Sequence, residues 1–387
     1  MTLEAPETPS GAAQPDLAST QAESSAVGHN APWTLVLPVF GALVLLLTGV
    51  LAPSIPGAFA LVTAALFTNV VTSVHHAEVI AHRVGEPLGT LVLALAVTVI
   101  EVALIVSMML AGGEATSGLP RDTVFAAVMI ILNGIIGLSL LVGGQRHHEQ
   151  EFRQDGMTAA LATLTVIVVF TLVLPNFATT APGPVYSSAQ LVFIAIATLV
   201  LFGGFTFVQT VRHRDYFLPQ GEHAEGDPSE HAAPPTNKET LTSLLLLLIA
   251  LVVVVLSAKS ISPTIEAWLI AAGAPLSTLG ILVAGIVLLP EGVAAVRAAR
   301  HNRVQTSLNL AIGSAIASIG LTIPIVAVVT LVMDWPLHLG LDDKSTLLLF
   351  LTLFVAALSL RTGRTTVLHG LVHLVLFAAY VFLSFIP

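Results

Sequence analysis

The sequence predicts an all-α polytopic membrane protein with eleven transmembrane helices: an extra N-terminal helix plus two inverted five-helix repeats. Of the 387 residues, 55% are hydrophobic and only 10% are charged, whereas soluble domains carry about 25% charged residues. Long apolar stretches recur along the chain, and two of them contain a lone glutamate, Glu101 and Glu291, at equivalent places in the two halves. These features exclude a soluble core and predict a duplicated membrane domain.

Composition also limits the chemistry. The chain has no cysteine, which excludes disulfides, thiolate metal sites, iron–sulfur clusters and cysteine nucleophiles. The formal net charge of −9 argues against a nucleic-acid partner. We therefore expect no cofactor, and we expect the partners to be inorganic cations, protons and the lipid bilayer.

The chain begins with a tail, residues 1–32, that is rich in Pro, Ser, Ala, Glu and Gln and has no Lys or Arg. It lacks the basic and apolar regions of a signal peptide, so we expect it to be disordered. A spanning helix needs about 20 apolar residues. On this criterion the predicted spans are 33–52, 55–74, 86–111, 123–144, 157–175, 185–211, 241–258, 276–296, 307–333, 346–361 and 365–386.

The lysines and arginines test this count of spans. With eleven spans, eleven of the 14 basic residues fall on one side of the membrane and three on the other. Because basic loops face the cytoplasm, the N-terminus is predicted inside and the C-terminus outside, with a bacterial inner membrane as the expected location. The cytoplasmic group is Arg83, Arg146, Arg153, Arg212, Arg214, Lys238, Arg297, Arg300, Arg303, Arg361 and Arg364; the outer group is Arg121, Lys259 and Lys344.

A polar segment, residues 212–240, divides the chain. It separates a first five-span unit (55–211) from a second (241–387), and an extra helix at 33–54 precedes both. Because each unit has an odd number of spans, the second unit starts on the opposite side of the membrane from the first. The two units then have inverted topologies, as in transporters built from inverted repeats. A solvated linker and a regulatory metal or pH sensor are both open for this segment. The residues of interest in it are Glu222, His223, Glu225, Asp227, Glu230 and His231.

Glu101 and Glu291 are the strongest candidates for a functional site. A carboxylate at membrane depth costs about 2.5–3.5 kcal/mol on insertion scales, so it persists only with a partner ion or a proton. Each glutamate lies in the second span of its half and follows a short amphipathic segment, Val74–Pro87 or Ser257–Pro275. The matched pair predicts a cation site that also takes protons.

Further oxygen donors lie in the apolar spans that follow the glutamates. The stretches MIILNGIIG (Met129–Gly137) and AIGSAIASIG (Ala311–Gly320) contain small and polar residues that permit close helix crossing. For these donors, contacts between helices and ion binding are equally compatible with the pattern. The candidates are Asn133, Ser314 and Ser318, together with Glu86 as an entry carboxylate near the cytoplasmic mouth.

Four ordered stretches give the chain a family resemblance. They are VHHAEVIAHRVGEPLGTLVLALAVTVIEVALI (Val74–Ile105), LVGGQRHHEQEF (Leu141–Phe152), GILVAGIVLLPEGVAAVRAARHNRVQTSLNLAIGSAIASIGLTIP (Gly280–Pro324) and HGLVHLVLFAAYVFL (His369–Leu383). The chain resembles the Ca2+/H+ antiporters of the cation/proton exchanger family, within the cation/Ca2+ exchanger superfamily, and among them the bacterial ChaA-type members.

The resemblance implies eleven helices, with an acidic segment between two inverted repeats. It also implies that the glutamate of an Asn-Ala-x-Glu motif in each repeat binds Ca2+ and exchanges protons. These glutamates correspond to Glu101 and Glu291, and the motif's asparagines to Thr98 and Leu288. Thr98 still offers an oxygen and Leu288 does not, which leaves Na+ and K+ open as alternatives to Ca2+.

The expected function is secondary active exchange of Ca2+ for H+ by alternating access. A Na+ or K+/H+ antiporter on the same scaffold is the main alternative. A cation channel and an intramembrane enzyme are more distant, since the sequence has no GxSxG or HExxH motif and no pair of intramembrane aspartates. His369 and His373, one helical turn apart, are interpreted as packing residues rather than as metal ligands or a proton relay.

Overall fold

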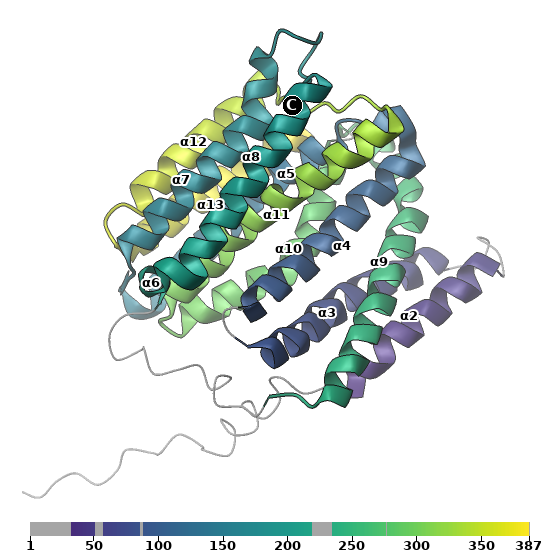
Figure 1. Ribbon diagram of the computed structural model, residues 1–387, viewed down its shortest axis with the longest axis horizontal. Helices are drawn as coiled ribbons and strands as arrows, with labels where there is room; N and C mark the ends of the chain where they lie inside the picture. The colour runs from purple at the N-terminus through teal and green to yellow at the C-terminus, as the bar shows by residue number, and fades with distance from the viewer. Residues whose placement is uncertain (1–31, 51–56, 86–87, 219–233, 276, 387) are drawn as a thin grey trace, which may run out of the picture.

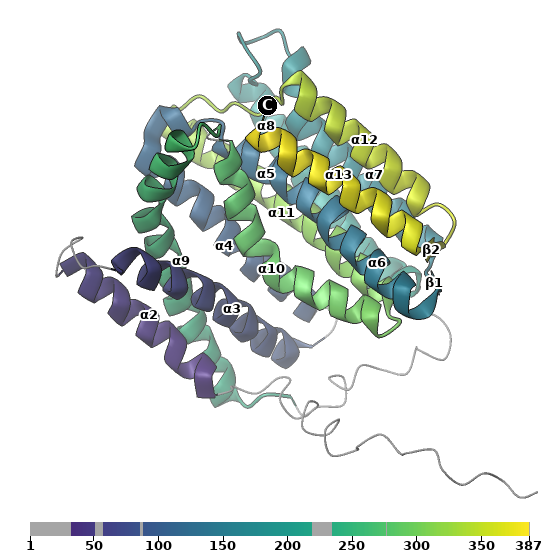
Figure 2. The ribbon, with the colours of Figure 1, turned by 180° about the vertical axis from the view of Figure 1, so that it is seen from behind.

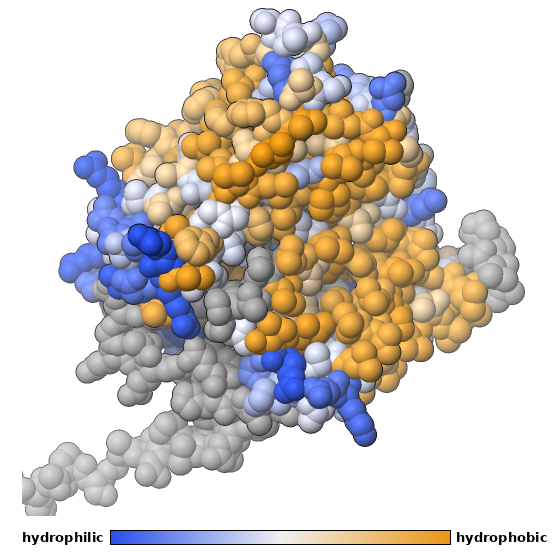
Figure 3. All heavy atoms as spheres, viewed as in Figure 1, coloured by the Kyte–Doolittle hydropathy of each residue, from blue (hydrophilic) through white to orange (hydrophobic). Residues whose placement is uncertain are grey.

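The computed structural model describes residues 32–50, 57–85, 88–218, 234–275 and 277–386, and these residues are almost entirely helical. Among these described residues, eight helices are long and apolar enough, by length and composition, to cross a membrane. The side chains on the outer surface fit that environment: Figure 3 shows a broad apolar face, with hydrophilic side chains gathered mainly at its left and lower edges. The protein is therefore an integral membrane protein.

The first half contains α2 and six further α-helices. Its α-helices are α2 (Pro32–Val50), α3 (Ala58–Val84), α4 (Leu88–Gly112), α5 (Leu119–Met129), α6 (Ile136–His147), α7 (Gln154–Val168) and α8 (Ser188–Phe207). Its short elements are the 3-10 turns η1 (Gly113–Thr116), η4 (Leu174–Phe177) and η6 (Arg214–Phe217), the π-helical segments η2 (Ile130–Ile135), η3 (Val169–Val173) and η5 (Val208–Arg212), and the strand β1 (Glu149–Glu151).

The second half contains fewer and longer elements. They are α9 (Asn237–Ala271), α10 (Thr278–Arg300), α11 (Val304–Met333), α12 (Asp343–Ser359), strand β2 (Arg364–Thr366) and α13 (Val367–Phe385). Local sequence explains several starts. Thr236 and Glu239 form a capping box at α9, Ser187 and Gln190 form one at α8, and the side chain of Asp342 caps α12.

Two helices are longer than the sequence pattern predicts. The amphipathic segments Val74–Pro87 and Ser257–Pro275 are not separate elements, because α3 continues to Val84 and α9 to Ala271. Nothing in either segment ends the helix earlier. After the start of α3, the next residue with positive φ is Gly85 (76°), and after the start of α9 it is Gly273 (69°). A glycine in this conformation is a common helix terminator. Pro263 is accommodated inside α9, as prolines in membrane helices often are.

The helices form two packed groups. Figures 1 and 2 show α2, α3 and α9 side by side at one end of the molecule, and the three helices are in mutual contact. The larger group contains α5 to α8 and α10 to α13 around an extensive buried apolar core. A second, smaller core joins α3 and α9 to α4 and α10. The helices that carry Glu101 and Glu291 therefore lie where the two groups meet.

A two-stranded sheet connects the halves in a way that the sequence did not predict. β1 and β2 pair antiparallel, with Glu149 opposite Thr366 and Glu151 opposite Arg364. The Arg364 guanidinium lies 2.9 Å from a carboxylate oxygen of Glu151. Since both strands are three residues long and polar, no hydrophobic periodicity marks them in the sequence.

Candidate ion-binding site

The two glutamates are held by one face of a third helix. Glu101 lies on α4 and Glu291 on α10. The Ser318 hydroxyl on α11 lies 2.7 Å and 2.6 Å from the two carboxylate oxygens of Glu101. The Ser314 hydroxyl, one turn earlier on α11, donates to Oε1 of Glu291 at 3.0 Å. Four of the predicted residues, from three helices and both halves, therefore form one cluster.

The two halves of this cluster differ in solvent exposure. Glu101 and Ser318 are buried, at 3% and 4% exposure. Glu291 and Ser314 are half-buried. The second carboxylate oxygen of Glu291 is nevertheless shielded, and it has no hydrogen-bond partner among the described residues. A buried oxygen of this kind, beside a second carboxylate that is close enough to interact electrostatically, is a suitable ligand for a cation.

Backbone and side-chain oxygens near the glutamates add to the potential ligands. Thr98, also buried at 3% exposure, lies one turn before Glu101 on α4. Pro290 lies inside α10 directly before Glu291. Because proline has no N–H, the carbonyl four residues earlier, that of Ile286, loses its usual donor within the helix. Leu288 of α10 is buried and its side chain has no oxygen. The α4 side of the site therefore offers more side-chain oxygen ligands than the α10 side.

Asn133 occupies a different cluster. It lies in the π-helical segment η2, where its Nδ2 donates to the Thr352 hydroxyl of α12 at 2.9 Å and its Oδ1 faces Nδ1 of His373 of α13 at 3.0 Å. Both ends of the amide are thus engaged away from the glutamates. Glu86 and the linker residues Glu222, His223, Glu225, Asp227, Glu230 and His231 lie outside the described residues.

Sequence reasoning missed a set of amides that ties the halves together at one end of the bundle. The buried Gln150 of β1 donates from Nε2 to the carbonyl of Ala299, in the last turn of α10 (2.9 Å), and to Oδ1 of Asn302, in the turn between α10 and α11 (3.0 Å). Gln305 accepts from the backbone N–H of Arg153. Only the polarity of these residues is visible in the sequence, and polarity alone predicts an exposed loop.

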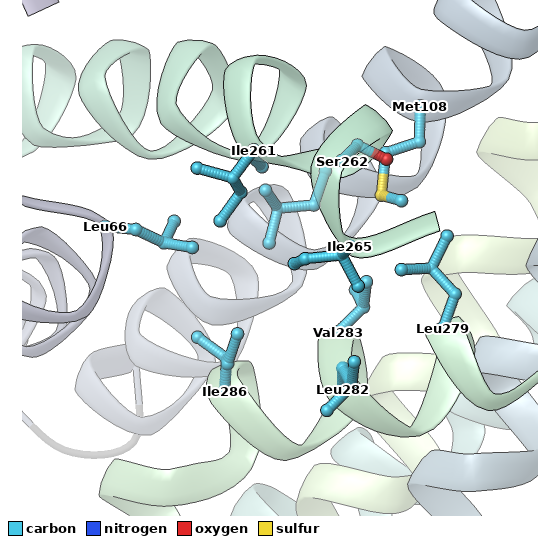
Figure 4. A pocket seen from close by; sticks show the side chains of 11 residues that line it. Leu66, Met108, Ile261, Ser262, Ile265, Leu279, Leu282, Val283 and Ile286 are labelled. Atoms are coloured by element: carbon cyan, nitrogen blue, oxygen red, sulfur yellow. The ribbon is translucent and has the colours of Figure 1, made fainter. Parts of the chain in front are cut away.

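An apolar pocket lies beside the glutamate helices. It occupies about 380 Å3, counting the space at its open mouth, and is lined by α3, α4, α9 and α10 (Figure 4). Met108 and Ile286 are among its walls, and its polar side chain, Ser262, donates to Glu266. An apolar lining cannot replace the water shell of an ion, so this pocket is not the cation site.

No group of three or more His, Asp or Glu side chains within the described part of the chain is arranged to hold a metal ion. The candidate site is therefore a two-carboxylate site completed by hydroxyl and carbonyl oxygens.

Comparison with known proteins identifies the class. The family described as sodium/calcium exchanger protein matches this chain twice, over residues 54–211 and 242–386. The chain belongs to this family of cation exchangers within the cation/Ca2+ exchanger superfamily.

Individual relatives cover nearly the whole chain. It is 46% identical over 363 residues to "Putative ionic transporter y4hA" of Sinorhizobium fredii, covering 93% of this chain and 97% of the relative. It is 33% identical over 355 residues to the sodium-potassium/proton antiporter ChaA of Escherichia coli, covering 91% and 96%. These relatives are named as transporters.

Solved structures show the same fold. Native YfkE and the H+/Ca2+ exchanger CAX each match with a TM-score of 0.67 at 16% identity and cover 95% of this chain, with 99% and 89% of their own chains covered.

Proposed function

We propose that this protein is a secondary active antiporter that exchanges Ca2+ for H+ across the membrane by alternating access. Cation and protons compete for Glu101 and Glu291, while Ser314, Ser318 and Thr98 supply oxygen atoms. The observation that carries the proposal is the position of Ser318 and Ser314 on α11, one turn apart, each in contact with a glutamate from a different half.

The contacts between Ser318 and Glu101 support a proton on the Glu101 carboxyl group. A hydroxyl has one proton to donate, yet Ser318 lies within hydrogen-bond distance of both oxygens of Glu101. Both contacts become full hydrogen bonds when Glu101 itself carries a proton and donates it to the serine oxygen. Ionised Glu101 instead leaves an oxygen available to a cation.

Charge balance makes exchange obligatory in this account. Two carboxylates with one Ca2+ sum to zero, and so do two carboxylates with two protons. The empty, ionised site carries a charge of −2, which is costly in a low-dielectric interior. The transporter therefore switches between its inward-open and outward-open conformations when the site holds Ca2+ or two protons, and it does not switch when the site is empty.

The proposed architecture is eleven spans, with the helix at 33–54 added to inverted repeats at 55–211 and 241–387. Two matches of one family to the two halves support this division. The basic residues support a cytoplasmic N-terminus and an outward C-terminus in a bacterial inner membrane. Within this proposal Asn133 positions the helices, since both ends of its amide are engaged.

A Na+ or K+/H+ antiporter is the second candidate, and two observations favour it. A relative with 33% identity is named a sodium-potassium/proton antiporter. Leu288 also leaves the α10 side of the site with one fewer oxygen than the motif of the family provides, and monovalent ions need fewer charged ligands.

Proteoliposome flux distinguishes the candidates. Purified protein is reconstituted with a pH-sensitive dye inside the vesicles, and Ca2+, Na+, K+ and Mg2+ are added outside in turn. The proposal expects Ca2+ to drive proton movement and Glu101→Gln and Glu291→Gln to abolish it. Flux driven by Na+ or K+ alone selects the second candidate. Flux that either glutamine variant retains at the wild-type level refutes the site.

A further inference from the structure

The two glutamates differ in how their own helices enclose them. On α4, the residues three and four positions before and after Glu101 lie on the same face of the helix as Glu101. All four are buried, and they are Val97, Thr98, Leu104 and Ile105. The face of α4 that carries Glu101 therefore has no opening within one turn of it in either direction.

Glu291 is enclosed by α10 on one side only. Val287 and Leu288, in the turn before it, are buried at 2% and 3% exposure. After it, Ala294 is exposed and Ala298, one turn further, is half-buried. Three and seven residues along a helix return to the same face, so both alanines follow Glu291 along its own face. This face of α10 is therefore open toward the C-terminal end of the helix.

α11 is open in the same direction. Leu310 and Gly313 are half-buried, whereas residues 315–318 are buried throughout. A side chain added at Gly313 would meet nothing within 4 Å, so there is open space beside it. The open part of α10 comes after Glu291 and the open part of α11 comes early in that helix, and the turn at residues 301–303 joins these two parts. Both helices therefore open toward the α10–α11 turn.

Water, rather than hydrocarbon, fills this opening. The side chain of Glu291 is half-buried, and so is that of Ser314, which donates to its carboxylate. A carboxylate beside lipid tails is unfavourable, because the bilayer interior offers it neither a counter-ion nor a hydrogen-bond donor. An opening that reaches both of these side chains is therefore an aqueous one.

The other side of the glutamates is apolar. The pocket in Figure 4 is lined by Leu104 and Met108, which follow Glu101 on α4, and by Val283, which precedes Glu291 on α10. An ion that leaves its water shell gains nothing from walls of this kind. A cation therefore meets water on the side of the α10–α11 turn and an apolar barrier on the side of the pocket.

We propose that Glu291 is the entry carboxylate of this transporter. Cations and protons reach it through water from the α10–α11 turn, along a route lined by Ala294 and Gly313, and they reach Glu101 only by way of Glu291. By the positive-inside rule this end of the molecule is the cytoplasmic one, because three arginines lie there: Arg297, Arg300 and Arg303. The inference rests on the proposed antiport and adds the order in which the two glutamates are reached.

Thiol labelling tests the route, and the chain suits this experiment because it has no native cysteine. Ala294→Cys and Gly313→Cys are treated with a membrane-impermeant, cationic methanethiosulfonate in inverted vesicles, which present the cytoplasmic side, and in right-side-out vesicles. A thiol reacts as its thiolate, which forms in water and not in hydrocarbon. From the cytoplasmic side, both variants should react on the order of tenfold faster than Ala295→Cys, whose position is fully buried.

Leu289→Cys is the control for exposure to lipid. Leu289 is 49% exposed on another face of α10, and a thiol there should not react from either side. Because the space beside Gly313 is open, Gly313→Cys remains a test if Ala294→Cys does not fold. The proposal is overturned if either folded variant reacts no faster than the two controls, or reacts from the outer side.

A flux measurement separates the route from the antiport itself. Once Ala294→Cys is modified, the bulky cationic group occupies the route, so cation-driven proton flux in proteoliposomes should be lost. Ala295→Cys given the same treatment should keep its flux, because its thiol is not reached. Full flux through modified Ala294→Cys overturns the proposed route. Absence of flux in the wild type refutes the proposed antiport instead, and the labelling result does not depend on it.

Discussion

Single residues decide the chemistry of the site, and the serines of α11 are the least expected of them. The sequence singled out Ser314 and Ser318 as oxygen donors with an equal chance of being contacts between helices. In the structure each lies against a glutamate. This pairing was not predictable, because it depends on how α11 is rotated against α4 and α10, and a helix that is apolar on all sides has no periodicity to indicate rotation.

Removal of the Ser318 hydroxyl tests its role as a ligand. Ser318→Ala should weaken cation binding by roughly tenfold, because the hydrogen bond to a buried carboxylate and one oxygen ligand are lost together. Binding is measured by calorimetry on detergent-purified protein. Ser307→Ala is the matched control. It is a buried serine on the same helix whose hydroxyl has no partner among the described residues, and its affinity should stay within about twofold of the wild type. Equal affinities in the two variants would contradict the assigned role.

At the scale of elements, composition predicted where helices lie far better than where they end. The apolar spans coincide with the observed helices, whereas α3 and α9 run past their predicted ends until a glycine with positive φ. The π-helical segment at Ile130–Ile135 was visible only as a Gly- and Asn-containing stretch. Its position beside α10, α12 and α13 depends on packing that no local pattern encodes.

Packing of α13 on α6 depends on a close approach of their backbones. A side chain added at Gly370 would meet the backbone N of Leu141, and would lie 2.7 Å from the carbonyl oxygen of Gly137. Backbone atoms cannot move aside, so Gly370→Ala should destabilise the protein by about 1–3 kcal/mol. Thermal unfolding in detergent should show a lower midpoint.

Gly203→Ala is the control for this change. Gly203 is also in a helix, α8, and a side chain there meets nothing within 4 Å. Its midpoint should stay the same or rise slightly, since alanine favours helix by about 1 kcal/mol over glycine. A Gly370→Ala midpoint that matches the Gly203→Ala midpoint would show that the close approach is unimportant.

At the scale of the whole molecule, the duplicated pattern of charge and hydropathy predicted a membrane exchanger and two related halves. The family matches over 54–211 and 242–386 fall in the same two halves. The contacts that join the halves were not predictable. The paired residues of β1 and β2 are 213 to 217 positions apart in sequence. The amides around Gln150 look like ordinary loop residues until the chain is folded.

Gln150 provides a test of this junction. Gln150→Ala removes two hydrogen bonds, one to the end of α10 and one to the turn that follows it, and leaves the Ala299 carbonyl without that donor. This loss should cost about 1–3 kcal/mol of stability. Limited proteolysis and thermal unfolding would both report the loss. Gln154→Ala, at an exposed position four residues later, should behave like the wild type. Equal stability of the two variants would argue against a structural junction at Gln150.

The central claim is that cations and protons displace one another at Glu101 and Glu291. Its most direct test is proton release on cation binding, followed with a pH electrode in weakly buffered detergent solution. Addition of Ca2+, or of Na+ or K+ if these are the substrates, should release protons from the wild type. The Glu266→Gln control, which alters another serine-bonded acid on α9, should release as many. The Glu101→Gln/Glu291→Gln double variant should release none. Cation binding to the wild type without proton release, or unchanged release from the double variant, would contradict the account.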